Sequence, residues 1–225
     1  MPVLALDTSG AVAVALTSDS GEVLASRSES QQRHHAELLA PMITAVLADA
    51  GVDRRDLTAI VAGTGPAPFT GLRVGLVTAR TLALGLAIPV LGVPSLDAIA
   101  AAASRTAPVG ATILVATDAR RREVYWSSYR ADGPGEVSVL AGPTVGAAAA
   151  VTVEPGAIVV GRGVALYPAD LGDAPVPDGL LDPDPAELAR LALARRELGQ
   201  ALPTEPLYLR RPDAVPSAGS KRVGG

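Results

Sequence analysis

The chain repeats an ordered set of features in its two halves, and this repeat limits the fold more than any other feature. Leu4-Ala-Leu-Asp7 and Val115-Ala-Thr-Asp118 are short segments that end in aspartate, and the two aspartates lie 111 residues apart in a chain of 225. Each is followed by a hairpin pattern and by Gly-Glu-Val, at residues 21–23 and 135–137. Later in each half an apolar segment ends in Gly-x-Gly, at residues 63–65 and 161–163. The repeated order predicts two similar lobes built around buried strands.

We therefore expect a duplicated α/β fold in which each lobe has a mixed sheet led by antiparallel strands. The alternative is a single α/β sheet in which the spacing of these features is coincidental. We assign residues 1–104 to the first lobe and 105–203 to the second, and we expect 204–213 to rejoin the first lobe. Residues 214–225 are small and polar, which predicts a disordered tail.

Missing residue types exclude several kinds of chemistry. The chain has no cysteine and no asparagine, which excludes thiol nucleophiles, cysteine metal sites and the protein-kinase catalytic loop. The single lysine, Lys221, precedes Arg222 rather than serine or threonine, so there is no Walker A loop. The only histidines, His34 and His35, are adjacent, whereas helical metal ligands lie three or four residues apart. We interpret them as surface residues at a helix start, and we expect no metal site.

Charge and hydropathy indicate a cytoplasmic protein that does not enter a membrane. The net charge of −4 argues against this chain forming the main nucleic-acid-binding surface, which is usually basic. The longest apolar stretch, residues 81–96, contains Pro89 and Pro94 and is shorter than the roughly 20 residues that cross a bilayer. The first residues lack the basic start of a signal peptide.

The polar turns that come after the first strand of each half are the candidate ligand site. A carboxylate, two hydroxyl groups and unpaired backbone N–H groups at such a turn can bind phosphate or a metal-bound water. Two lobes could then clamp a nucleotide between them, with the later glycines allowing close approach of an adenosine. The residues of this candidate cleft are Asp7, Thr8, Ser9, Asp118, Gly161 and Gly163. The alternative is that the aspartates cap turns and the glycines serve tight turns. Because no serine stands in a nucleophile elbow and no paired-carboxylate motif is present, we predict a vestigial cleft without catalytic residues.

A helix predicted from residue 70 carries a small residue at every fourth position, from Gly71 to Ala87. Such a stripe allows another backbone to approach closely. Either it packs on this chain's own sheet, or it joins the broad apolar face of the helix predicted over residues 35–50 in an intermolecular bundle. The candidate interface residues are Leu38, Leu39, Met42, Val46, Gly71, Leu72, Gly75, Ala79 and Ala83.

Several motifs together resemble the bacterial TsaB (YeaZ) family. They are Leu4-Ala-Leu-Asp-Thr-Ser9, His35-x-x-Leu-Leu-x-Pro41, Gly65-Pro-Ala-Pro-Phe-Thr-Gly-Leu-Arg-Val-Gly75, Gly92-Val-x-Ser-Leu96, Asp118-Ala-Arg120 and Tyr208-Leu-Arg-Arg-Pro-Asp213. These matches span residues 3 to 213. The chain departs from the family at Ala67-Pro68, where Gly-Ser is usual.

The resemblance implies an actin-like, sugar-kinase-like fold and a part in threonylcarbamoylation of adenosine 37 in tRNAs that read codons starting with A. It implies a non-catalytic paralogue that binds and activates the TsaD transferase through its first-lobe helices, with the TsaE ATPase joining them. TsaD binds its metal through a His-x-x-x-His pair, and here Leu39 stands four residues after His35. The resemblance further implies a homodimer when alone, tRNA contact through the complex rather than directly, and no resident cofactor. Whether ATP or ADP binds at a partner interface stays open.

Two other functions fit the same residues. One is a small ATP-dependent phosphotransferase or ATPase that uses Asp7 and Asp118 around magnesium. The other is a homodimeric binding module without a partner enzyme.

Overall fold

Short runs of aliphatic residues form the strands that lead each lobe. The computed structural model describes residues 1–30 and 35–210, and the side chain of His35 lies outside the described part. The interpretation of His34 and the predicted disorder of residues 214–225 also lie outside it. Every residue of β1 (Val3–Asp7), β2 (Val12–Thr17) and β4 (Ala59–Gly63) is buried, as expected for strands covered on both faces.

The two sheets share one strand arrangement, which confirms the predicted duplicated α/β fold. The first sheet has the order β3-β2-β1-β4-β5 and the second has the order β8-β7-β6-β9. In each sheet the leading strand pairs antiparallel with the next strand in the chain and parallel with a later one. The remaining strands are β3 (Val23–Glu29), β5 (Val90–Val93), β6 (Thr112–Arg120), β7 (Glu123–Gly133), β8 (Glu136–Ala147) and β9 (Ile158–Val160).

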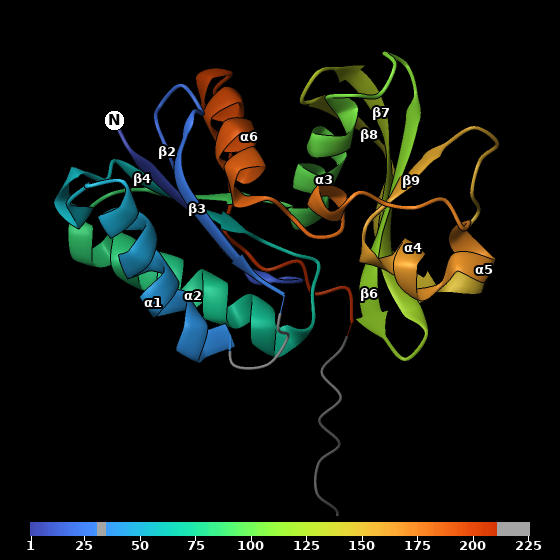
Figure 1. Cartoon of the computed structure of the whole chain (residues 1–225), viewed down its shortest axis with the longest axis horizontal. Coiled ribbons are helices and arrows are strands. Elements are labelled where there is room, and N and C mark those ends of the chain that lie inside the picture. The colour runs from blue at the N-terminus through green and yellow to red at the C-terminus, as the bar shows by residue number, and fades with distance from the viewer. Residues whose placement is uncertain (31–34, 211–225) are drawn as a thin grey trace, which may run out of the picture.

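Helices cover both faces of both sheets, and one helix of each half covers the sheet of the other half (Figure 1). The first sheet lies between the pair α1 and α2 and the helix α6, while the second lies between α3 and the short α4 and α5. The helices are α1 (His35–Asp49), α2 (Phe69–Leu86), α3 (Ser95–Ser104), α4 (Arg162–Leu166), α5 (Pro168–Leu171) and α6 (Pro185–Glu197). Short 3₁₀ turns are η1 (Arg54–Asp56), η2 (Ala148–Ala150) and η3 (Asp178–Leu180).

The exchanged helices α3 and α6 pack on each other between the sheets, and charged groups join them at both ends. Asp97 of α3 accepts hydrogen bonds from the hydroxyl of Tyr129 at 2.9 Å and from Arg195 of α6 at 2.7 Å. At the other end Glu187 of α6 pairs with Arg105 at 2.7 Å. The carboxylates of Asp97 and Glu187 are buried, and their pairing with arginines holds α3 and α6 together.

The division at residue 104 separates the strands of the two sheets but not their helices, because α3 packs on the second sheet and α6 on the first. The segment after α6 returns to the first lobe: the Leu207 N–H donates to the Thr64 carbonyl at 2.9 Å. Within residues 1–30 and 35–210, none of the helices combines the length and the apolar character that crossing a bilayer requires.

Candidate functional site

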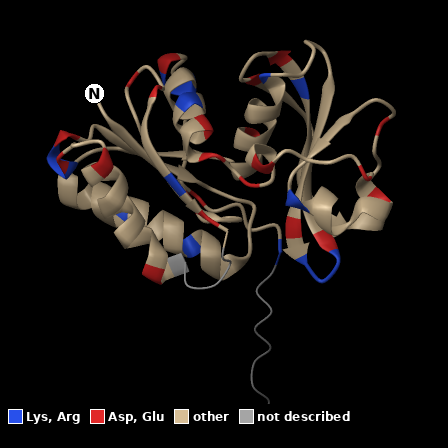
Figure 2. Ribbon diagram, viewed as in Figure 1, with Lys and Arg blue, Asp and Glu red and all other residues tan. Residues whose placement is uncertain are grey.

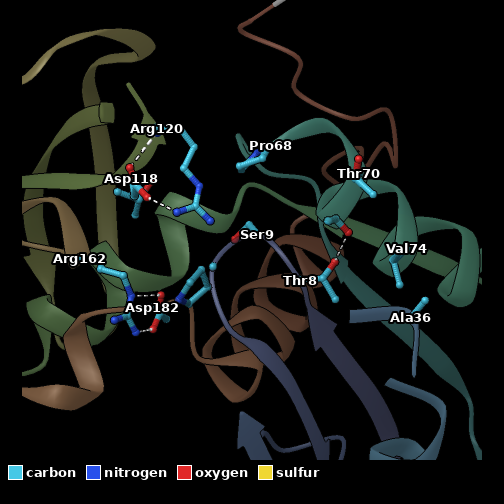
Figure 3. A pocket seen from close by; sticks show the side chains of 14 residues that line it. Thr8, Ser9, Ala36, Pro68, Thr70, Val74, Asp118, Arg120, Arg162 and Asp182 are labelled. Carbon is cyan, nitrogen blue, oxygen red and sulfur yellow. Dashed lines mark hydrogen bonds and ion pairs between the residues drawn. The ribbon is translucent and has the colours of Figure 1, made fainter. Parts of the chain in front are cut away.

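A cavity of about 480 Å³ lies where the ends of β1 and β6 face each other between the lobes (Figure 3). The structure thereby brings together Thr8, Ser9 and Asp118 of the predicted cleft. The start of α2 and the loop before α6 complete the walls. The lining residues are Thr8, Ser9, Gly10, Ala36, Pro68, Thr70, Gly71, Val74, Thr117, Asp118, Arg120, Arg162, Asp182 and Pro183.

Asp7 ends β1 but is not among the residues that line the cavity. Its side chain is buried and accepts hydrogen bonds from the Ser9 N–H at 2.7 Å, the Ser9 hydroxyl at 2.5 Å and the Ser95 hydroxyl at 2.6 Å. Burial raises the pKa of Asp7 to about 6, because desolvation outweighs these hydrogen bonds. A Cβ atom on Gly63 would overlap Oδ2 of Asp7, so glycine is required there. Asp7 therefore closes the turn and holds the start of α3.

Thr8 fixes the next part of the turn to α2. Its hydroxyl donates to the Gly71 carbonyl at 2.8 Å and accepts from the Gly75 N–H at 3.1 Å. A Cβ atom on Gly75 would overlap this hydroxyl, so the small residue at position 75 lets β1 and α2 approach each other. The walls of the cavity contributed by the first lobe are thus held by side chain–backbone contacts.

The second lobe contributes charged side chains to the cavity, and each carboxylate has an arginine partner (Figure 3). Asp118 pairs with Arg120 at 3.2 Å and accepts from the Arg120 N–H at 2.8 Å. Asp182 receives two hydrogen bonds from Arg162, and the pairing raises the pKa of that guanidinium. None of Arg120, Arg162 and Asp182 was predicted as a cavity residue from the sequence. Arg120 stands in the Asp118-Ala-Arg120 motif, but no short-range pattern connects the other two.

Gly161 and Gly163, which were predicted as part of the cleft, are not among the residues that line the cavity. A Cβ atom at either position would overlap or press on the carbonyl oxygen of Ala116 in β6. Gly161 also has a φ of 98°, which favours glycine. These glycines let the β9–α4 connection pack against β6, so they serve a tight turn rather than a ligand.

The stripe on α2 packs on this chain's own sheet. Gly75, Ala79 and Ala83 are buried, and the two alanines belong to the core formed with β1, β4 and α1. Six of the predicted interface residues are buried within this chain. These six are Leu39, Val46, Leu72, Gly75, Ala79 and Ala83. Leu38, Met42 and Gly71 remain partly exposed. Helix–helix and helix–sheet packing both favour small residues one turn apart, so the pattern could not distinguish them.

The cavity is lined by apolar and polar groups together, and the charges of its four ionised side chains largely cancel. Thr8, Ser9 and Thr70 offer hydroxyl groups, while Asp118 and Asp182 are matched by arginines. Among the described residues, no group of three or more histidine, aspartate or glutamate side chains is placed to hold a metal ion. Asp7 and Asp118 do not converge on a common point in the cavity, because Asp7 turns toward Ser95.

Comparisons with known proteins cover most of the chain. The family model described as TsaD, tRNA N6-adenosine threonylcarbamoyltransferase, matches residues 22–159. An uncharacterized protein of Mycobacterium tuberculosis is 44% identical over 196 residues, which are 87% of this chain and 84% of that protein. The Escherichia coli tRNA threonylcarbamoyladenosine biosynthesis protein TsaB is 42% identical over 137 residues, 60% of this chain and 58% of that protein. The structure of YeaZ from Pseudomonas aeruginosa has 33% identity and a TM-score of 0.77, and it covers 92% of this chain and 99% of that one.

Proposed function

The chain belongs to the TsaB (YeaZ) family, and on that basis we propose that it is a non-catalytic subunit that binds and activates a TsaD transferase. The reaction is threonylcarbamoylation of adenosine 37 in tRNAs that read codons starting with A. A TsaE ATPase joins the pair in the cytoplasm, and the tRNA is bound by the complex. In the absence of TsaD, the chain forms a homodimer.

Exposed apolar side chains on α2 are the observation that carries this proposal. Val77 is 60% exposed and Leu84 is 84% exposed, on the side of α2 opposite the buried stripe. The neighbouring helix α1 adds the partly exposed Leu38 and Met42. We call these four residues the outer helical face. Large apolar side chains that gather on a surface mark protein interfaces, and two long helices suit a helical bundle with a partner.

The side chains of the candidate site also support a non-catalytic role. The cavity carboxylates Asp118 and Asp182 are paired with arginines of the same lobe. Leu39, at the position where a TsaD metal site has its second histidine, is 1% exposed within the core. The rival phosphotransferase has less support, because Asp7 is buried and bonded to two serines instead of facing Asp118. Calorimetry with ATP and magnesium tests that rival directly.

Reconstitution with matched variants tests the proposal. The purified chain is mixed with TsaD and TsaE, and the modified nucleoside in the tRNA is measured alongside heterodimer affinity. We expect Val77→Asp and Leu84→Asp each to raise the dissociation constant of the TsaD heterodimer about tenfold or more, as for central interface residues. Val139→Asp is the control, because Val139 is 54% exposed on the second lobe. Full tRNA modification without this chain would contradict the proposal.

A further inference from the structure

The hairpin between β6 and β7 turns on arginines at positions where the backbone favours glycine. The register pairs Arg120 with Glu123, which leaves Arg121 and Arg122 as a two-residue loop. The φ angles of residues 120, 121 and 122 are 65°, 54° and 63°. Two-residue loops with positive φ at both positions strongly prefer Asn-Gly and similar pairs. Three arginine side chains in this region carry a steric cost, which suggests that the side chains themselves have a role.

Two of the other three hairpins between consecutive strands use glycine where φ is positive. The β2–β3 hairpin has Gly21 at a φ of 79°, and the β7–β8 hairpin has Gly135 at a φ of 84°. Their positive φ angles are therefore adopted without a Cβ penalty. Since the chain uses glycine for the same purpose elsewhere, the arginines at the β6–β7 tip are not explained by the turn itself.

The arginine tip continues into a row of cationic and aromatic side chains formed by the end of the described chain and α2. Arg210 donates to the Ala119 carbonyl at 2.9 Å and pairs with Glu123 at 3.1 Å, which fixes the end of the described chain beside the hairpin. Two residues earlier, Tyr208 accepts a hydrogen bond from Arg73 of α2 at 2.9 Å.

Phe69 joins this row from the start of α2, because its ring centroid lies 4.9 Å from that of Tyr208. The guanidinium of Arg73 lies 3.6 Å above the Phe69 ring. We call this row the basic rim. It consists of Phe69, Arg73, Arg120, Arg121, Arg122, Tyr208 and Arg210.

The charge of the basic rim is opposite to that of the whole chain. The rim combines five arginines with the neighbouring carboxylates Asp118 and Glu123, whereas the chain has a net charge of −4. Figure 2 shows the basic loop at the end of β6, beside the point where the described C-terminal segment ends. Arg121 and Arg122 are exposed, and Tyr208 is 37% exposed. Guanidinium groups interleaved with aromatic rings suit RNA, since arginines bind phosphates and rings stack on unpaired bases.

We propose that the basic rim contacts the phosphodiester backbone of the tRNA that the complex modifies. The proposal rests on the proposed function, and it gives this chain a direct share in RNA binding that its net charge does not suggest. The rim extends from the second-lobe hairpin to α2 of the first lobe, which lets one RNA strand contact the hairpin tip and the Phe69–Tyr208 rings together. An acidic protein surface could bind the same arginines, and the experiment below distinguishes RNA binding from protein binding.

The test uses glycine substitutions, because glycine removes the charge and suits the positive φ. The double variant Arg121→Gly/Arg122→Gly is expected to melt at or above the temperature of the unchanged chain. The assembled complex with TsaD is titrated with labelled tRNA at several salt concentrations. We expect the dissociation constant to rise about tenfold and the salt slope to fall by about two, one for each lost phosphate contact. The control is Arg54→Gly/Arg55→Gly, an exposed arginine pair in η1 remote from the cavity, which should change neither quantity.

Heterodimer affinity without RNA is measured for the same variants. Weakened tRNA binding with unchanged heterodimer affinity supports the basic rim as an RNA contact. Unchanged tRNA affinity and salt slope overturn it, and so does a loss of TsaD binding, which would identify the rim as a protein contact. If the unchanged chain does not bind TsaD at all, the proposed function fails. The tRNA titration is then repeated on the chain alone at low salt. If the double variant and the unchanged chain bind tRNA with equal affinity, the proposed RNA contact of the basic rim is wrong, whatever the outcome for TsaD.

Discussion

The two lobes begin with equivalent strands that carry an aspartate at matching positions, yet the two aspartates have different surroundings. Asp7 is 1% exposed and accepts hydrogen bonds from Ser9 and Ser95. Asp118 lines the cavity and pairs with Arg120. The difference comes from the segment after each strand, because β1 leads into a turn held by hydroxyl groups, whereas β6 leads into the arginine hairpin. A repeated strand therefore repeats the position of a carboxylate but not its chemistry.

The coverings of the two sheets differ in the same way. The first sheet carries α1 and α2, of 15 and 18 residues, whereas the corresponding face of the second carries α4 and α5, of five and four residues. Long helices leave an outer surface after their inner face has packed, and Val77 and Leu84 lie on that surface. The first lobe thus presents the outer side of two long helices to solvent, while the second presents a hairpin and the edge strand β8.

The largest expected loss of stability comes from replacing glycines of the second lobe. Two such variants separate the cost of a steric overlap from the cost of an unfavourable backbone conformation. Gly161→Ala places a Cβ atom against the Ala116 carbonyl at a φ of 98°, and we expect a loss of about 4 kcal/mol or a failure to fold. Gly172 has a φ of 100° but nothing near its Cβ position. Gly172→Ala should therefore cost only the conformational part, about 1–3 kcal/mol. Denaturant unfolding measures both, and equal losses would show that the contact with β6 is unimportant.

A smaller effect distinguishes the two aspartates by pH. The pKa of Asp7 is raised by burial from 3.8 to about 6, so the folded state holds this proton more tightly than the unfolded state. The resulting stability is fully present below pH 3.8 and is lost as the pH rises through 6, a change of about 3 kcal/mol. Asp7→Asn, which keeps a neutral side chain of the same shape, should remove this decrease in stability with rising pH.

The control for that experiment is Asp118→Asn in the second lobe. This change removes the charge partner of Arg120 but leaves Asp7 in place, so the decrease in stability between pH 4 and 6 should persist. The measurement is the free energy of unfolding of all three proteins across this range. An unchanged pH profile in Asp7→Asn would mean that Asp7 does not hold its proton in the folded state.

The smallest effect concerns two equivalent positions in the second strands. Thr17 pairs with Val3 of β1, and Ser128 pairs with Leu114 of β6. Because Val3 and Leu114 each lie four residues before the aspartate of their strand, Thr17 and Ser128 occupy equivalent positions in the two lobes. The Thr17 hydroxyl is buried and has no hydrogen-bond partner among the described residues. Thr17→Val should raise the free energy of unfolding by about 1 kcal/mol, because it removes an unsatisfied polar group without changing shape. Ser128→Ala, at a partly exposed position, should change it little, and a loss in Thr17→Val would indicate an unseen partner.

Local patterns were sufficient to predict the elements that depend on nearest neighbours. Asp184, Pro185 and Glu187 form a pattern typical of a helix start, and in the structure Asp184 accepts from the Ala186 N–H at 2.8 Å as an N-cap does. The same local signals could not show which sheet α6 covers. Its buried Leu188, Ala189 and Ala192 pack on the first sheet although the helix comes after the second in sequence.

The candidate cleft was predicted in part for a similar reason. Thr8, Ser9 and Asp118 lie at strand ends that meet between the lobes, so topology alone brought them together. Arg162 and Asp182 lie 20 residues apart and join across a loop, which no periodicity reports. The α2 stripe was recognised as a close-packing surface, but its partner was decided by which side of the helix faces the sheet.

The sequence by itself determined the duplication, the strands that lead each lobe, and the absence of thiol and P-loop chemistry, because these depend on residue types and their order. Only the tertiary structure decided that α3 and α6 exchange sheets, that Asp7 is buried while Asp118 faces the cavity, and that the α2 stripe packs inside. Burial and pairing depend on residues distant in the chain, and a carboxylate's pKa depends on those neighbours rather than on its own position in a motif.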